Sequence, residues 1–294
     1  MGCRLCPRMC SVDREKGQRG YCGMSEEIYV ARAALHMWEE PCLSGESGSG
    51  TVFFSGCTLR CVFCQNHMIA DGSVGKKISV ERLAEIFLEL QKKGANNINL
   101  VTPTHYAKQI QQSLAISKKA GLCIPIVYNT SGYETVEAIR ELEGYIDIYL
   151  PDFKYISKEL SFRYSKAADY FERASAALKE MVRQRKEAVY GEDGMMKRGV
   201  IVRHLMLPGC IEDSKAVIRY LYTKYQDRIV ISIMNQYTPL SFQKDMPELN
   251  RKVTAKEYEE LVDYAISLGV ENGFIQEGDT AQESFIPAFD LEGI

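Results

Sequence analysis

From Thr51 onward, short apolar runs alternate with segments whose apolar residues recur at helical spacing. Runs rich in β-branched and aromatic residues predict buried strands at 51–56, 97–103, 123–129, 146–153, 199–207 and 228–234. Helical spacing predicts helices at 79–93, near 105–120, near 134–142 and from 254 to 269. This alternation predicts an α/β fold whose parallel sheet is open or curled into a partial (β/α)6 TIM-like barrel.

Residues that cap helices support two of these elements. Ser79 suits the start of the helix at 79–93, and Gly94 suits its end. Thr254 and Glu257 have the spacing of a capping box, and Gly269 can end the helix that they begin. The long segment 155–190 carries Ala, Leu, Tyr and Phe on one side and predicts an extended helix. Such a helix could cover a small-molecule pocket, whereas an open barrel could admit a protein loop.

Residues 1–50 are predicted to form a cysteine-rich, metal-binding cap on a barrel domain at 51–294. The cap has one plausible strand at 27–35 and ends in the Ser/Gly-rich connector "SGESGSG" at 44–50. Few apolar residues are available there for a core, so a metal could supply the missing stability.

Composition narrows the function classes. The 294 residues are 46% hydrophobic and carry a net charge of −3, so no basic surface for nucleic acid or membrane is expected. The sequence shows no long apolar run and no signal segment, which predicts a cytoplasmic protein. Ten cysteines in such a protein favour metal or redox chemistry over a disulfide framework.

Seven of the cysteines fall in two groups. Cys57, Cys61 and Cys64 have the spacing C-x3-C-x2-C and follow the first predicted strand, at the edge of a parallel sheet where active sites collect. Thiolates select zinc, copper(I) or iron–sulfur clusters. Structural zinc and a fully ligated [4Fe–4S] cluster take four protein ligands, so three thiolates leave an open position of the kind that a catalytic site keeps.

The stretch "GCTLRCVFCQN" (56–66), with Phe63 before its last cysteine, resembles the cluster loop of radical S-adenosylmethionine (SAM) enzymes. Within that superfamily the chain resembles the pyruvate formate-lyase activating enzymes, over roughly residues 51–275. The resemblance implies a [4Fe–4S] cluster with three irons on Cys57, Cys61 and Cys64 and SAM on the fourth. One-electron cleavage of SAM would then give a 5′-deoxyadenosyl radical that abstracts hydrogen from a substrate.

The same resemblance implies cofactor-binding residues at the ends of later strands. Asp152 and Lys154 in "PDFKY" are similar to the family's Asp-x-Lys, and Arg203 in "VRHLMLPG" to its Arg before a Pro-Gly turn. The family's Gly-Gly-Glu stretch is replaced by "VTPTHY". The remaining candidates are therefore polar residues that follow strands two, three and six: Thr102, Thr104, His105, Asn129 and Asn235. Ordinary hydrogen bonds, or a buried Asp–Lys pair, are the structural alternative for these residues.

Cys3, Cys6, Cys10 and Cys22 form the second group, spaced C-x2-C-x3-C-x11-C. Four ligands suit a second [4Fe–4S] cluster or a zinc ion, and a folded cap without metal is the remaining alternative. Cys42, Cys123, Cys210 and Trp38 are interpreted as packing or loop residues.

The predicted function is hydrogen abstraction by a radical SAM enzyme that installs a glycyl radical on a partner enzyme and receives electrons from a flavodoxin- or ferredoxin-type donor. Radical modification of another protein or of a small molecule is the second hypothesis. An iron–sulfur protein that transfers electrons or scaffolds a complex is the non-enzymatic alternative.

Overall fold

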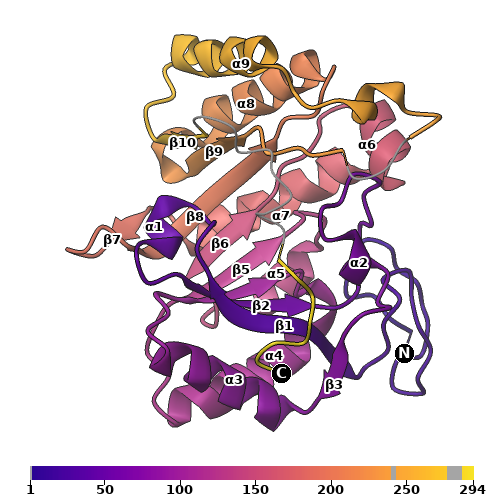
Figure 1. Cartoon of the computed structure of the whole chain (residues 1–294), viewed down its shortest axis with the longest axis vertical. Coiled ribbons are helices and arrows are strands. Elements are labelled where there is room, and N and C mark those ends of the chain that lie inside the picture. The colour runs from indigo at the N-terminus through magenta and orange to yellow at the C-terminus, as the bar shows by residue number, and fades with distance from the viewer. Residues whose placement is uncertain (1, 240–242, 277–286) are drawn as a thin grey trace.

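A twisted, largely parallel sheet with helices packed on its outer side forms the centre of the molecule (Figure 1). The computed structural model describes residues 2–239, 243–276 and 287–294. Strand order is β10-β9-β8-β6-β5-β4-β2-β1-β3, with the short β7 paired to β8. The sheet is not closed, so the predicted α/β fold with a partial barrel is confirmed.

The strands of the parallel part are β2 (Ser49–Phe54), β4 (Ile98–Val101), β5 (Ile126–Thr130), β6 (Ile148–Pro151), β8 (Met196–Leu205), β9 (Val230–Met234) and β10 (Gly273–Ile275). The antiparallel additions are β1 (Ile28–His36), β3 (Lys76–Ile78) and β7 (Val189–Tyr190). All six strands predicted after residue 50 are therefore present, and β1 corresponds to the strand expected at 27–35.

Most helices follow a parallel strand and return the chain to the next one. They are α1 (Pro41–Ser44), α2 (His67–Ala70), α3 (Val80–Lys92), α4 (Ala107–Lys119), α5 (Val136–Glu141), α6 (Lys158–Ser165), α7 (Tyr170–Gln184), α8 (Ile211–Tyr225) and α9 (Ala255–Leu268). Short 3-10 turns lie at Thr104–Tyr106, Gln226–Arg228 and Pro247–Asn250.

The predicted helix caps are confirmed. The Ser79 side chain accepts a hydrogen bond from the Arg82 backbone N–H, and Thr254 and Glu257 form both halves of the capping box. Gly269 ends α9 with a φ of 93°, in the left-handed region that favours glycine. The single helix predicted over 155–190 is wrong, because Lys166 adopts the left-handed conformation (φ 50°) and separates α6 from α7.

The segment after β1 fills the bottom of the barrel. Cys42 and Leu43 of α1 pack against apolar strand residues: Val127, Ile148, Leu150, Ile201 and Val230. Each of these lies two or four positions before a residue that lines the cavity, so it is on the same, lumen side of its strand. The connector expected at 44–50 is therefore largely buried structure, since Ser44 ends α1 and Ser49 begins β2. The domain boundary at residue 50 stays a prediction, although β1 pairs with β2 across it.

The described part of the C-terminal tail, 287–294, lies along β1. The Leu291 N–H donates to the Ala31 carbonyl, and the Ala33 N–H donates to the Glu292 carbonyl. The tail thereby borders the open side of the barrel, where Pro287 reaches the central cavity.

Candidate active site

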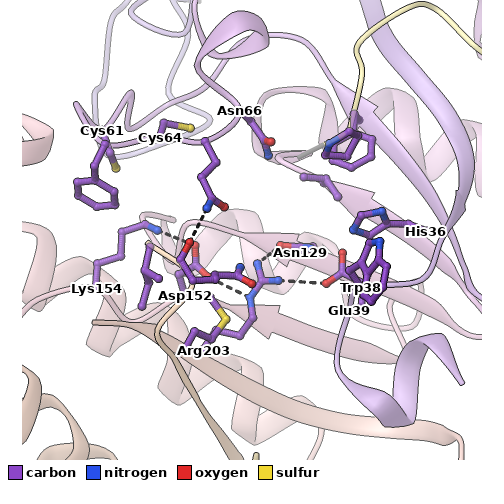
Figure 2. A pocket seen from close by; sticks show the side chains of 18 residues that line it. His36, Trp38, Glu39, Cys61, Cys64, Asn66, Asn129, Asp152, Lys154 and Arg203 are labelled. Atoms are coloured by element: carbon purple, nitrogen blue, oxygen red, sulfur yellow. Dashed lines mark hydrogen bonds and ion pairs between the residues drawn. The ribbon is translucent and has the colours of Figure 1, made fainter. Parts of the chain in front are cut away.

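The carboxyl ends of the parallel strands and the loop after β2 surround a cavity of about 190 Å³. Figure 2 shows Cys61 and Cys64 on one side of this cavity and His36, Trp38 and Glu39 on the other. Strands β5 and β8 and the residues after β6 contribute polar side chains to its floor, and Phe53, Val101, Leu205 and Met234 contribute apolar ones. The cavity therefore lies where parallel α/β folds bind their ligands.

A charged network centred on Arg203 occupies the floor of the cavity. The Arg203 guanidinium donates to Asp152 Oδ1 (3.1 Å), Glu39 Oε2 (3.1 Å) and Asn129 Oδ1 (2.6 Å). Lys154 Nζ donates to the other carboxylate oxygen of Asp152 at 2.7 Å. The structure thus brings together four predicted site residues, from β5, from the segment after β6 and from β8, and one acid that was not predicted (Figure 2).

Burial and charge oppose one another in this network. Burial alone would raise the pKa of Asp152, but the Lys154 and Arg203 cations outweigh it and hold that pKa below its usual value. Burial dominates at Glu39 and raises the pKa of its carboxyl, although Arg203 acts against it. The two cations and two acids therefore form a chain of contacts, from Lys154 through Asp152 and Arg203 to Glu39.

Two further residues of the segment before α1 contribute to the cavity region and were missed or misread from the sequence. Trp38, interpreted as a packing residue, lines the cavity and is 61% exposed, which places it where the cavity reaches the surface. Glu40 is buried beside Ser232, and its Oε2 has no hydrogen-bond partner within the described residues. Nothing in the local sequence marks Glu39 or Glu40 as buried, because only the folding of this segment into the barrel buries them.

Three candidates from "VTPTHY" lie outside the cavity lining. Thr104 is buried and donates to Glu134 Oε1 at 2.6 Å. His105 Nε2 lies 2.7 Å from the Ser55 carbonyl oxygen, and burial lowers the pKa of this imidazole to about 3. Thr102 has a φ of 58°, and its N–H donates to the Asn129 carbonyl. These contacts favour structural roles, and a role in cofactor binding stays a prediction for all three.

At the end of β9 the cavity is lined by Gln236 and not by its neighbour Asn235. The Gln236 carbonyl accepts a hydrogen bond from the Gln65 side chain at 2.7 Å, which ties this strand end to the cysteine loop. The Asn235 backbone N–H donates to Gln276 Oε1 at 2.8 Å. The assignment of Asn235 as a cofactor-binding residue stays a prediction.

Two of the three loop cysteines, Cys61 and Cys64, line the cavity, and Cys57 does not. Ser165 Oγ donates to Cys61 Sγ at 3.0 Å, and the backbone N–H groups of Leu59 and Arg60 donate to Cys57 Sγ at 3.4 Å. Burial raises the pKa of the Cys64 thiol, and the nearby Cys57 and Cys61 thiols raise it further. Three thiols close enough to influence one another, with donors aimed at two of the sulfurs, fit a group that binds thiolates.

The N-terminal cysteines also influence one another. Burial raises the pKa of Cys6 to about 12, and the Cys22 and Cys10 thiols act in the same direction. All ten cysteines are free thiols in the structure. Within residues 2–239, 243–276 and 287–294, no group of three or more His, Cys, Asp or Glu side chains is arranged to hold a single metal ion. Both sets of cysteine ligands therefore stay predictions.

Together the strand order and the cavity define a partial α/β barrel that carries a cysteine-rich loop beside the carboxyl ends of its parallel strands. The model of the family described as the radical SAM superfamily matches residues 51–221. The chain belongs to the radical SAM superfamily, whose members bind a [4Fe–4S] cluster and SAM.

Three similar proteins place the chain among its relatives. An uncharacterized protein of Methanocaldococcus jannaschii is 32% identical over 272 residues, which are 90% of this chain and 74% of the relative. A radical SAM methyltransferase from Sphaerobacter thermophilus has a similar fold, with a TM-score of 0.54, 13% identity and coverage of 78% of this chain and 66% of that one. SuiB of Streptococcus suis bound to SAM gives a TM-score of 0.51, 14% identity and coverage of 75% and 48%.

The chain thus spans about half to two thirds of the two solved chains, and their likeness shows the fold alone. Among the described residues, no helix is both long and apolar enough to cross a membrane.

Proposed function

We propose that this radical SAM protein is an activating enzyme of the pyruvate formate-lyase type, which abstracts hydrogen from a glycine in a loop of a partner glycyl radical enzyme. The observation that carries the proposal is that Cys61 and Cys64 line the same cavity as the Arg203 network. The loop sequence 56–66 resembles that family, and Asp152 and Lys154 after β6 and Arg203 in β8 are similar to its Asp-x-Lys and Arg patterns. We also propose that the protein acts in the cytoplasm.

In this proposal Cys57, Cys61 and Cys64 hold three irons of the cluster. When bound and reduced, such a cluster cleaves SAM reductively and supplies the 5′-deoxyadenosyl radical that takes the hydrogen atom. Lys154 and Arg203 offer cationic donors for the carboxylate of the methionyl group, and Asp152 and Asn129 offer acceptors for the ribose hydroxyls or the amino group.

The surroundings of the thiols would keep water away from them. Phe63 packs edge-on against Tyr155, Tyr164 and Tyr237, with ring centroids 6.3–6.4 Å apart. This aromatic layer lies directly beside the thiols, because Phe63 precedes Cys64 in the loop. Exclusion of water would protect a reactive radical from side reactions.

An open cavity supports a protein loop as the substrate. Among the described residues that line it, none comes from α6 or α7, so these helices do not cover the cavity as a helix over 155–190 could have done. α6 instead packs behind the loop, where the Val62 N–H donates to the Tyr164 carbonyl. Two proteins of similar fold were solved with peptides: SuiB with the precursor peptide SuiA, and anSMEcpe with the Kp18Cys peptide.

The test is an anaerobic incubation of the reconstituted, reduced protein with SAM and purified pyruvate formate-lyase, followed by electron paramagnetic resonance (EPR) spectroscopy. We expect the glycyl radical signal on the partner, and no signal with Cys61→Ala. Formation of 5′-deoxyadenosine without a glycyl radical on this partner or on other purified glycyl radical enzymes would contradict the activating role. It would leave radical modification of another substrate.

A further inference from the structure

We infer that the four N-terminal cysteines hold a second iron–sulfur cluster that passes electrons to the cluster on loop 57–64. This inference rests on the proposed radical chemistry, because it assigns the route by which the catalytic cluster is reduced. No part of the catalytic cavity uses these cysteines. Their purpose must therefore be sought in what the N-terminal segment, residues 3–26, contacts.

The first contact places Cys22 beside the loop at 56–66 that carries Cys57, Cys61 and Cys64, here called the catalytic loop. Gly56, the residue before Cys57, has a φ of 86°, and a Cβ built on it would lie 2.6 Å from the Cys22 carbonyl oxygen. It would also collide with Met24, so only glycine fits at this position. The chain at Cys22 thus packs against the residue that adjoins the first cluster ligand, and the two cysteine groups lie next to each other in space.

Arg8, between Cys6 and Cys10, provides a second connection. Its guanidinium donates to the Thr58 carbonyl at 3.0 Å and to the Ser165 carbonyl at 2.8 Å. It also lies over the Tyr21 ring, 3.9 Å from the centroid. The same Ser165 donates through its hydroxyl to Cys61 Sγ. A single arginine therefore joins the N-terminal cysteines to the catalytic loop and to the residue that hydrogen-bonds a catalytic thiol.

A third connection runs in the opposite direction. Arg60, between Cys57 and Cys61, donates to the Tyr21 carbonyl at 3.1 Å. Tyr21 directly precedes Cys22, and its own N–H donates to Cys10 Sγ at 3.2 Å. Hydrogen bonds thus link each cysteine group to backbone next to the other group, which gives a short path through bonds and contacts.

The exposure of the four thiols suits an electron entry point. Cys6 and Cys22 are buried, whereas Cys3 and Cys10 are partly exposed. Four thiolates can ligate all four irons of a [4Fe–4S] cluster and leave no open position for SAM. Zinc binds the same kind of ligand, but among the described residues no three or more such side chains are arranged to hold a single metal ion, and zinc has no redox chemistry with which to relay an electron. The position beside the catalytic loop therefore favours iron and sulfide.

The relay moves one electron and no atoms. A reduced one-electron donor of the flavodoxin or ferredoxin class is oxidised by one electron, and the N-terminal cluster is reduced by one. That electron then passes to the catalytic cluster, so the N-terminal cluster returns to its oxidised state. No proton transfer or bond change is needed at the N-terminal site.

The first experiment measures metal content after anaerobic reconstitution with iron, sulfide and zinc together. We expect about eight irons per wild-type chain and about four in the Cys6→Ala/Cys10→Ala variant. The Cys57→Ala/Cys61→Ala/Cys64→Ala variant should also keep about four. Cys123→Ala is the matched control, because Cys123 is an exposed residue before β5 and belongs to neither group, and this variant should keep about eight irons. Zinc or no metal on the N-terminal cysteines would overturn the inference.

The second experiment compares two reductants. For Cys6→Ala/Cys10→Ala, the ratio of the 5′-deoxyadenosine rate with reduced flavodoxin to the rate with dithionite should fall at least tenfold below the wild-type ratio. An unchanged ratio would overturn the relay. If the variant fails to fold, EPR of the reduced wild type decides: two interacting paramagnetic clusters support the relay, and one isolated signal contradicts it. A wild type with about eight irons that makes no 5′-deoxyadenosine would contradict the proposed function and not the second site.

Discussion

Asn129 and Thr130 are neighbours on β5, yet they belong to two different polar networks. Asn129 lies on the lumen side and accepts a hydrogen bond from Arg203. Thr130 lies on the opposite side of the strand and donates to Glu134, which also accepts from Thr104. Side chains alternate across a strand, so one step along the sequence changes the layer to which a polar residue belongs.

The two networks differ in charge as well as in place. The lumen network holds Asp152 and Glu39 against the cations Lys154 and Arg203 beside the cavity. The second network, Thr104, Thr130 and Glu134, is called the sealed network because all three residues are buried outside the cavity lining. There burial raises the pKa of Glu134 to about 7, and no cation lies among the causes of that shift. The difference teaches that a polar residue at a strand end is a candidate for binding the cofactor only when its side chain faces the lumen and has a charged partner there.

Removal of Arg203 should have the largest effect. Arg203→Ala leaves Asp152 and Glu39 buried without their shared cation, which should destabilise the fold by about 3–5 kcal/mol and reduce 5′-deoxyadenosine formation at least a hundredfold. Chemical denaturation and product quantification measure the two effects. Arg203→Lys keeps the charge but loses the fork of donors, and should be intermediate. Wild-type stability and turnover in Arg203→Ala would show that the network is dispensable.

The sealed network should respond to pH and not to SAM. Because the pKa of Glu134 is raised to about 7, the folded chain keeps a proton that the unfolded chain releases, so stability falls as pH rises from about 4.5 to about 7. Relative to Glu134→Gln, the wild type should lose about 2–3 kcal/mol of unfolding free energy between pH 5 and pH 8. Denaturation curves at the two pH values measure the difference, and a constant difference would refute the assignment.

Thr104→Val should have the smallest effect. It removes one buried hydrogen bond to Glu134, for a loss of about 1–2 kcal/mol of stability, while the affinity for SAM stays at the wild-type level. Calorimetric titration of the reconstituted protein with SAM supplies the second quantity. Several-fold weaker SAM binding would restore Thr104 to the cofactor site that the sequence suggested.

The parts of the fold that were predictable from the sequence depend on local interactions. The ends of α9 follow from Thr254, Glu257 and Gly269, all of which act within one turn of the helix end. The break between α6 and α7 was missed because a lysine, Lys166, adopts the left-handed conformation there, and lysine carries no compositional mark of a turn.

The site was predictable at strand ends whose residues resemble the family's patterns. Asp152 and Lys154, which are two positions apart, and Arg203 were predicted in this way, and all three line the cavity. Glu39 could not be found in this way, because its partner Arg203 lies 164 residues away and the acid sits in what looks like a connector. Long-range burial of a short segment inside a barrel leaves no periodic pattern in the sequence.

The measurement that tests the central claim most directly is 5′-deoxyadenosine formation by the anaerobically reconstituted, dithionite-reduced protein with SAM, quantified by mass spectrometry. The account predicts product from the wild type and none from Cys61→Ala, with Cys123→Ala matching the wild type. Equal product from Cys61→Ala, or none from a wild type with a verified cluster and bound SAM in the presence of pyruvate formate-lyase, would contradict it.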